Sequence, residues 1–313
     1  MLNRRYLRIK VYQALYAYWQ GDGSNAARIE QELHLSIQRT FDLYLALLLV
    51  FGEVHRAAER RIEERRNKRL PTAEDLSPNL RFVQNPVLQA LMDERLDTAS
   101  EKRKVNWVGE QEIVTKILRQ FEASEEFQRY MALPEPTFKD HQEVVLHLFV
   151  EHIANFDQLQ EFFEARSIHW LEDLDLACSM VKRTIEGVRE GGKASLTDLF
   201  RGPDEEREFV STLYRRTIDQ GAEHELAIAE KASNWESDRI ALSDMILMKM
   251  ALTEARVFSE VPVKVTLNEY IEIAKAYSTP KSRSFINGIL DKLFAEMKED
   301  GRIRKVGRGL LEN

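Results

Sequence analysis

The sequence predicts an all-α fold, and three observations carry that prediction. Apolar residues recur with the helical period of 3.6 in nearly every segment, and no stretch alternates apolar and polar residues for long enough to form a strand. The 313 residues include only eight prolines and thirteen glycines, which are fewer turn residues than an all-β protein needs. Apolar residues make up 43% of the chain, which is enough for a packed core.

The first expected helix has one apolar face and a clear end. Leu7, Val11, Leu15 and Tyr18 share that face, and the helix ends at Gly21. The same periodicity predicts further helices over residues 24–35, 37–69, 86–96, 107–121 and 125–131. Near residue 261 a short alternation containing a proline predicts a loop that enters another helix.

A shift of 65 residues brings two parts of the chain into register. The agreeing positions are Glu143 with Glu208, Val145 with Val210, Leu148 with Leu213, Ile153 with Ile218, Trp170 with Trp235, Asp173 with Asp238 and Met180 with Met245. Each copy would be a long helix, a tryptophan-bearing turn and another helix, with residues 187–203 as the linker. Two all-α segments share apolar spacing easily, so duplication and chance resemblance are both open.

Charge and cysteine content restrict the class of protein. Acidic residues outnumber basic ones by 52 to 45, for a formal net charge of −7, which excludes a uniformly basic nucleic-acid-binding protein but not local basic patches. The single cysteine, Cys178, cannot form an intrachain disulfide. The longest strictly apolar run, residues 43–51, is far shorter than the roughly 20 residues of a membrane span. We therefore expect a cytoplasmic protein with no membrane segment.

No motif of a catalytic or metal centre is found in the sequence. Residues 187–193 fit the start of a phosphate-binding loop, but Ala194 stands where a hydroxyl belongs, and a helix precedes the segment instead of a strand. No histidine pair has the spacing of a helical zinc hydrolase, and His147 and His152, five residues apart, are expected on different sides of a helix. We expect no enzyme activity, no metal and no cofactor.

The first helix is strongly basic although the whole protein is acidic. Arg5, Arg8, Tyr12 and Tyr16 form a stripe beside the apolar face, and neither arginine lies on that face. Guanidinium groups bind phosphates bidentately, and tyrosine rings offer planes for unstacked bases, a combination that suits single-stranded RNA. The alternative is a helix with solvated arginines and packed tyrosines.

A second candidate site follows a Thr-Pro pair that is typical of a helix N-cap and first helical residue. Lys281 and Arg283 would add cations to the free N–H groups of that helix start, which favours binding of a phosphate. Phe285 flanks the expected core, so its ring is either a stacking platform for a base or part of the core. Asn287 lies mid-helix at a propensity cost, which indicates a polar contact or close packing.

A third basic stretch lies at the C-terminal end of the chain. Arg302, Arg304, Lys305 and Arg308 are interspersed with glycines. We expect a disordered tail that adds unspecific attraction to RNA.

Several motifs in a fixed order resemble the NusB family of transcription antitermination factors. Near the start, Arg4-Arg5-Tyr6-Leu7-Arg8 and Gln13-Ala14-Leu15-Tyr16 resemble the arginine-rich first helix of that family. The later motifs are Asp238-Arg239-Ile240, Ala251-Leu252-Thr253-Glu254, Val261-Pro262-Val263-Lys264-Val265, Asn268-Glu269, Ile273-Ala274-Lys275 and Phe285-Ile286-Asn287-Gly288-Ile289-Leu290-Asp291-Lys292. The resemblance covers residues 4–20 and about 205–295.

The resemblance implies a NusB-like helical bundle with an additional helical insertion or a partial duplication. The expected parts are the arginine-rich first helix at 1–20, a helical expansion at 21–204, the C-terminal helices at 205–297 and a basic tail at 298–313. The first helix should pack against the C-terminal helices, because its apolar stripe is otherwise unburied.

The resemblance also implies binding of the boxA element of nascent ribosomal RNA, together with the ribosomal protein NusE, within the RNA polymerase antitermination complex. Arg4, Arg5 and Arg8 match the RNA-binding arginines of the family, and Phe285 matches an aromatic residue near the RNA. With the residue patterns above, the expected RNA-binding set is Arg4, Arg5, Arg8, Tyr12, Lys281, Arg283, Phe285 and Asn287.

The resemblance places NusE contacts at two positions, and it includes departures. Tyr16 and Asp244 match positions that face NusE in the family. Tyr6 and Ser284 stand where basic residues are common. The cations that could compensate for the missing charge are Lys281, Arg283 and Lys10. The alternative function is a helical protein–protein interaction scaffold that keeps the fold but binds RNA weakly or not at all.

Overall fold

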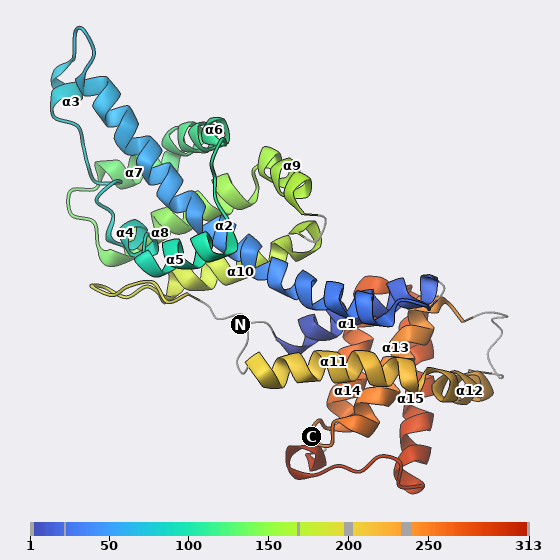
Figure 1. Ribbon diagram of the computed structural model, residues 1–313. Coiled ribbons are helices and arrows are strands. Elements are labelled where there is room, and N and C mark those ends of the chain that lie inside the picture. The colour runs from blue at the N-terminus through green and yellow to red at the C-terminus, as the bar shows by residue number, and fades with distance from the viewer. Residues whose placement is uncertain (1–2, 22, 168–169, 197–202, 233–239, 312–313) are drawn as a thin grey trace. The chain divides into compact units, whose positions relative to one another are not determined.

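The helices of the chain belong to two separate units (Figure 1). The computed structural model describes residues 3–21, 23–167, 170–196, 203–232 and 240–311. Within these ranges the regular elements are all helical and no strand occurs, so the predicted all-α class is confirmed. The insert unit comprises Gln38–Leu199, and the flanking unit combines Leu2–Ile37 with Phe200–Asn313.

The flanking unit brings the first residues of the chain together with its last third. Its helices are α1 (Arg4–Gln20), the start of α2 (Ala26–Arg66), α11 (Pro203–Asp219), α12 (Gly221–Ala232), α13 (Leu242–Val257), α14 (Val263–Tyr277), α15 (Pro280–Glu299) and a short 3₁₀ helix, η2 (Gly307–Leu310). The entry to α14 agrees with the predicted loop, because Pro262 is its N-cap. The predicted motif Asp238-Arg239 and the tryptophan Trp235 lie outside the described residues.

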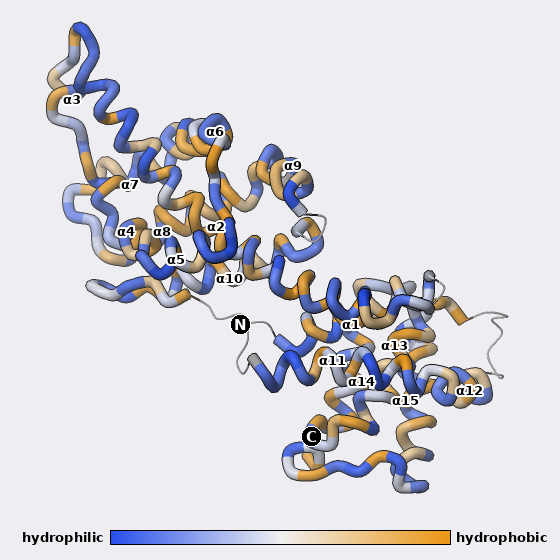
Figure 2. The backbone as a smooth tube through the Cα atoms, viewed as in Figure 1, coloured by the Kyte–Doolittle hydropathy of each residue, from blue (hydrophilic) through white to orange (hydrophobic). Residues whose placement is uncertain are grey.

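Helix α13 is the central element of the flanking unit. It contacts α1, α11, α12, α14 and α15, and most of its length is coloured as hydrophobic in Figure 2. A continuous run of its residues, from Ile246 to Ala255, is buried on every side of the helix. A helix buried all round is the usual centre of a bundle, and here it includes charged side chains that need partners.

Helix α1 packs on the C-terminal helices, as its apolar stripe predicts. Asn3 caps it by accepting a hydrogen bond from the Tyr6 amide at 2.8 Å. Leu7, Val11 and Leu15 are completely buried, and the helix contacts α11, α13 and α14. The predicted docking of the first helix on residues 205–295 is therefore confirmed.

The boundary between the two units lies within α2, whereas the sequence predicted it at residue 21. The predicted helices at 24–35 and 37–69 form one helix, since no glycine or proline stands between them. Its first turns belong to the flanking unit because they contact α11: the Tyr214 hydroxyl donates to the Ala26 carbonyl at 3.1 Å, and the Arg215 Nε donates to Glu30 at 2.8 Å.

The insert unit is built on the longer part of α2. Its other elements are α3 (Ala73–Leu76), α4 (Pro86–Leu91), α5 (Glu94–Arg103), α6 (Gln111–Glu122), α7 (Glu125–Ala132), α8 (Phe138–His147), the π-helix η1 (Leu148–Ala154), α9 (Asp157–Arg166) and α10 (Trp170–Gly187). Helix α5 was missed by the sequence analysis, because its apolar positions are few and only Leu96 and Ser100 are buried.

The apolar part of α2 is the core of the insert unit. Phe51 is buried against Phe149, with ring centroids 6.0 Å apart, and the Trp107 indole donates to the Ala46 carbonyl at 2.8 Å. By length and composition alone a window of α2 could cross a membrane, with a mean hydropathy of 1.3, but 67% of that window is buried inside the protein. Such burial is typical of a core helix.

The prediction that His147 and His152 lie on different sides of a helix is wrong. Residues 148–154 form a π-helix, in which about one more residue is needed for each turn. Residues five apart then share a face, and the two Nε2 atoms lie 3.3 Å from each other. Glu126 lies 3.4 Å from the Nε2 atom of His147.

The helix bounds repeat at the offset of 65 residues. Adding 65 to the limits of α8 and η1, 138 and 154, gives 203 and 219, the limits of α11. The same shift moves α9 to 222–231, inside α12, and moves α10 to 235–252, overlapping α13. The helix order therefore agrees with the repeat, while a common origin of the two copies stays a prediction.

Candidate nucleic-acid interface

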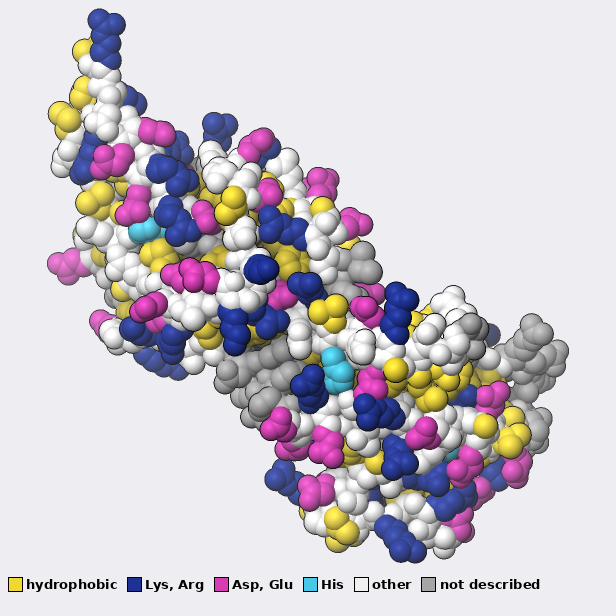
Figure 3. Space-filling view, viewed as in Figure 1, with side chains coloured by type: hydrophobic (Ala, Val, Ile, Leu, Met, Phe, Trp, Pro, Cys, Tyr) yellow, Lys and Arg dark blue, Asp and Glu magenta, His cyan; other side chains and the backbone are white. Residues whose placement is uncertain are grey.

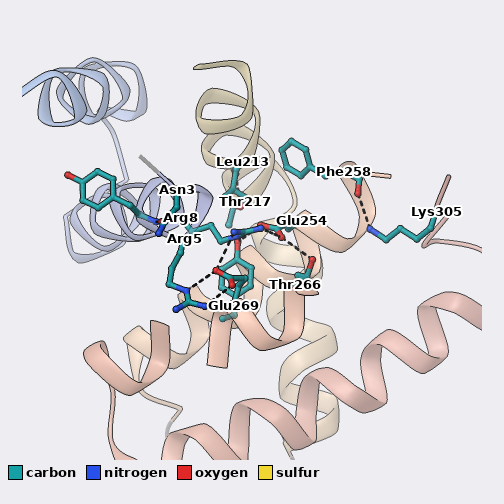
Figure 4. A network of polar contacts seen from close by, with 12 residues as sticks. Asn3, Arg5, Arg8, Leu213, Thr217, Glu254, Phe258, Thr266, Glu269 and Lys305 are labelled. Carbon is teal, nitrogen blue, oxygen red and sulfur yellow. Dashed lines mark hydrogen bonds and ion pairs between the residues drawn. The ribbon is translucent and has the colours of Figure 1, made fainter. Parts of the chain in front are cut away.

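Arg8 belongs to a buried polar network, not to a solvent-exposed surface (Figure 4). Its side chain is 3% exposed, and its Nε and Nη2 atoms donate to the two carboxylate oxygens of Glu254 at 2.7 and 2.8 Å. The hydroxyls of Thr266 and Tyr270 donate to the same carboxylate at 2.9 and 3.1 Å. The expectation that Arg8 faces solvent is therefore corrected: we call Arg8, Glu254, Thr266 and Tyr270 the buried network.

The electrostatics of the buried network follow from its enclosure. Burial alone would lower the pKa of Arg8, but its attraction to Glu254 and the paired hydrogen bonds outweigh this cost and raise the pKa. Burial, together with the nearby carboxylate of Glu254, also raises the pKa of Tyr270 well above its ordinary value. The arginine therefore stays charged and the tyrosine stays protonated as a donor.

The other two arginines of α1 lie at the surface. Arg5 donates to both carboxylate oxygens of Glu269 at 2.8 and 2.9 Å, and its side chain is 45% exposed. Arg4 pairs with Glu205 and lies over the ring of Phe209, 5.0 Å from the centroid. Both guanidinium groups are accessible to a ligand.

The expected cations of α15 are accessible as well, but its aromatic ring is not. Thr279 caps the helix as predicted, and Lys281 is exposed while Arg283 is half-buried. Phe285 is only 9% exposed, so of the two interpretations, platform or core, the structure favours the core. Asn287 donates to Asp291 one turn later at 3.1 Å, which is the polar contact that its position indicated.

Glu272 on α14 links the two basic segments. The hydrogen bond from Lys275 lowers the pKa of this carboxyl, and the fields of Arg5 and Arg283 lower it further. Both arginines are therefore close enough to Glu272 to act on it, although 278 positions separate them in sequence. We call Arg5, Lys281 and Arg283 the basic surface.

The tyrosines of α1 and Asp244 form a neighbouring cluster. Tyr12 is buried with its ring 5.1 Å from that of Tyr277 and 6.2 Å from that of Tyr16. Burial raises the pKa of Tyr12 to about 12, helped by Tyr16 and Asp244. Asp244 is 5% exposed and accepts a hydrogen bond from Ser278. Tyr12 and Asp244 are thus covered, and Tyr16 is half-exposed.

Lys10 cannot compensate for the missing cations at Tyr6 and Ser284. Its side chain is 2% exposed and its Nζ lies 5.3 Å from the centroid of the Tyr6 ring, a cation–π contact. A lysine held in this way is not accessible to phosphate.

An open groove of about 580 Å³ adjoins the first turn of α1. Four arginines, two glutamates and one asparagine line it together with four apolar residues: Asn3, Arg4, Arg5, Arg8, Glu260, Val261, Pro262, Val265, Glu269, Arg308 and Leu311. In Figure 3, basic, acidic and hydrophobic side chains are interspersed over the visible face of the flanking unit. The groove carries more positive than negative groups and has an apolar lining.

Sequence analysis missed the carboxylates that hold the arginines. Glu254 lies inside a run of buried apolar residues, and a carboxylate in such a run requires a cationic partner. That signal was present, but the partner lies 246 positions away and no local pattern identifies it. Among the described residues no group of three or more histidine, cysteine, aspartate or glutamate residues could hold a metal ion.

Comparison with known proteins assigns the family. The NusB family matches residues 181–295, from within α10 to α15. The transcription antitermination protein NusB of Salinibacter ruber is 46% identical over 105 residues, covering 34% of this chain and 66% of the relative. Its counterpart in Chloroherpeton thalassium is 42% identical over 106 residues, covering 34% of this chain and 50% of the relative.

A third NusB protein, from Agathobacter rectalis, is 35% identical over 98 residues, which is 31% of this chain and 75% of the relative. The chain thus spans about half to two thirds of the length of the first two relatives. No solved structure matches it. The shared region comprises the helices on which the arginine-bearing α1 packs, and on this evidence the chain belongs to the NusB family.

Proposed function

We propose that the protein is an RNA-binding transcription antitermination factor, acting in the cytoplasm as part of an RNA polymerase antitermination complex. Its RNA ligand would be the boxA element of nascent ribosomal RNA, bound together with the ribosomal protein NusE. The observation that supports this proposal most is the exposed guanidinium of Arg5 on α1, a helix that packs on the helices of the family match.

The charges of the basic surface suit a phosphate backbone. Arg5 is paired with Glu269 at the surface, and an exposed ion pair contributes little to stability, about 0–1 kcal/mol. A phosphate can therefore replace that carboxylate at small cost. Lys281 and Arg283 stand in the first turn of α15, where the positive end of the helix dipole gives an anion a further favourable interaction.

The buried residues of the expected RNA-binding set act indirectly in this proposal. Arg8 fixes α1 on α13 and α14 through Glu254, so that Arg4 and Arg5 are presented at the surface. Tyr12 and Phe285 are buried in the core of the same unit. For NusE, Tyr16 is the accessible contact, and Asp244 would position Ser278 beside it.

A binding experiment tests the proposal. Filter binding of boxA RNA and of a scrambled RNA of equal composition is measured with and without NusE. We expect preference for boxA and tighter binding with NusE. Equal, weak binding of both RNAs under both conditions would contradict the proposal and favour the interaction scaffold.

A further inference from the structure

The sequence analysis predicted a disordered C-terminal tail, and this prediction is wrong. The segment folds back onto the flanking unit as far as Leu311. The Val306 amide donates to the Ser259 carbonyl at 3.1 Å. The Lys305 Nζ donates to the Phe258 carbonyl at 2.9 Å, as Figure 4 shows. These contacts hold the segment against the turn between α13 and α14.

Gly309 is the position where this docking is closest. It is buried, and a Cβ placed on it would overlap the Ser259 carbonyl oxygen and lie 3.2 Å from the Cβ of Lys305. Backbone atoms cannot move aside as a flexible side chain can, so a larger residue would displace the segment. A glycine is thus needed here for a close approach of two backbones.

The docked segment places Arg308 in the groove beside α1. Of the four arginines that line the groove, Arg4 pairs with Glu205, Arg5 with Glu269 and Arg8 with Glu254. Arg308 is exposed and has no ion pair within the described part of the chain. A cation held in a groove by backbone docking, with its charge not neutralised, is suited to bind an anion from outside the protein.

We infer that the docked C-terminal segment forms an additional RNA subsite, in which Arg308 binds a phosphate of a strand that continues from the basic surface. Arg5 belongs both to that surface and to the groove, so one strand can contact both. This inference rests on the proposed function, and it assigns to the RNA a path past the first helix.

The lining of the groove fits a nucleotide better than a bare anion. Val265 is 44% exposed and Leu311 is 56% exposed, and Val261 and Pro262 lie beside them. Apolar side chains next to guanidinium groups can cover the face of an unstacked base while the arginine binds the adjoining phosphate. Single-stranded RNA offers an unstacked base next to a phosphate in every nucleotide.

Fluorescence anisotropy with labelled boxA RNA, carrying several flanking nucleotides at each end, tests the subsite over a salt series. The variants are Arg308→Gln, which removes the charge, and Gly309→Ala, which keeps every charge but displaces the segment. Arg304→Gln is the matched control: it lies in the same segment, and its Nε donates to the Gly301 carbonyl outside the groove. Amide hydrogen exchange of Val306 reports whether the segment is docked.

Arg308→Gln should flatten the log–log salt slope by about 0.7, equivalent to about 5-fold weaker binding at 0.1 M salt. Gly309→Ala should weaken binding similarly and expose the Val306 amide, and Arg304→Gln should match the wild type. Wild-type RNA affinity in Arg308→Gln would overturn the inference. Equal losses of affinity in Arg304→Gln and Arg308→Gln would overturn it too, and so would unchanged affinity in Gly309→Ala when hydrogen exchange shows that the segment is released. If the inference fails in one of these ways, the proposed function still stands provided that the wild-type protein binds boxA RNA and Arg5→Gln weakens that binding. If the wild-type protein does not bind boxA RNA at all, both the inference and the proposed function are overturned.

Discussion

The buried network and the basic surface use arginines that stand one turn apart on α1, Arg8 and Arg5. Each makes a bidentate contact with a glutamate, at similar distances. Arg8 is 3% exposed and its glutamate is completely buried, whereas Arg5 is 45% exposed. The comparison shows that two arginines with the same pairing geometry differ in solvent access, and only the exposed one can reach a ligand.

The physical difference lies in what replaces each ion pair when it is broken. A buried carboxylate that loses its cation keeps its desolvation cost, because water cannot reach it. A surface carboxylate that loses its cation is hydrated at once, so the pair can be exchanged for a phosphate. Breaking the buried network should therefore destabilise the fold, whereas the ion pair of Arg5 can open at small cost.

The largest expected effect comes from Arg8→Met. It leaves Glu254 buried without a cation, so the free energy of unfolding should fall by about 3–5 kcal/mol. Urea denaturation of the full chain measures this change. Adding Glu254→Gln should restore part of the stability, since it removes the unpaired buried charge and its amide oxygen still accepts from one of the two hydroxyls, Thr266 or Tyr270. A stable Arg8→Met protein with weakened RNA binding would instead place Arg8 at the interface.

Phe285→Ala should give the next largest effect. Its ring is 9% exposed beneath the basic surface, and truncation of a buried phenylalanine costs about 3–5 kcal/mol, with the lower end expected at this margin of the core. Melting temperature and boxA affinity are measured on the same variant. The folded fraction should keep its affinity; a strong loss of affinity at unchanged melting temperature would establish the stacking platform.

The helical class, and the docking of α1 on the C-terminal helices, could be predicted because both follow from apolar periodicity. Leu7, Val11 and Leu15 needed a partner, and the chain offered apolar helices near its end. The π-helix at Leu148–Ala154 could not be predicted, since such turns are rare and the apolar spacing of these residues also fits an α-helix. The docked C-terminal segment was also missed, because a basic, glycine-containing sequence is typical of disorder, and only the fold shows that Gly309 meets Ser259.

The candidate site was predictable as two basic segments but not as one surface. Arg5 and Arg283 were identified from charge and helix-start signals, and the structure adds that both act on Glu272. The burial of Arg8 was missed because a helical wheel shows a residue's own helix and not the neighbouring one. Arg8 lies beside the apolar stripe, and α13 and α14 cover that position as well.

A buried histidine extends the comparison to pH. His224 is 2% exposed, and burial, aided by Arg256, lowers its pKa to about 4. Below about pH 6.5, the ordinary pKa of histidine, His224 takes up a proton in the unfolded chain but not in the folded protein. The free energy of unfolding therefore decreases as the pH is lowered from about 6.5 to about 4. Between pH 7.5 and 5 this contributes a loss of about 2 kcal/mol. His224→Gln should reduce the loss in urea denaturation by that amount; equal pH dependence in both proteins would show that His224 is not held neutral.

The smallest expected effect on stability, and the most direct test of the basic surface, is Arg5→Gln. Its ion pair with Glu269 is exposed, so the free energy of unfolding should change by less than about 1 kcal/mol. Loss of one phosphate contact should flatten the log–log salt slope of boxA binding by about 0.7. Arg56→Gln is the matched control, because that arginine also makes an exposed ion pair, with Glu53, but lies in the insert unit. If both Arg5→Gln and Arg56→Gln had the salt slope of the wild type, Arg5 would have no contact with RNA. Solvent access alone would then not identify an RNA-binding arginine. A flatter slope in Arg5→Gln alone, at wild-type stability, would separate its role from that of Arg8 one turn away.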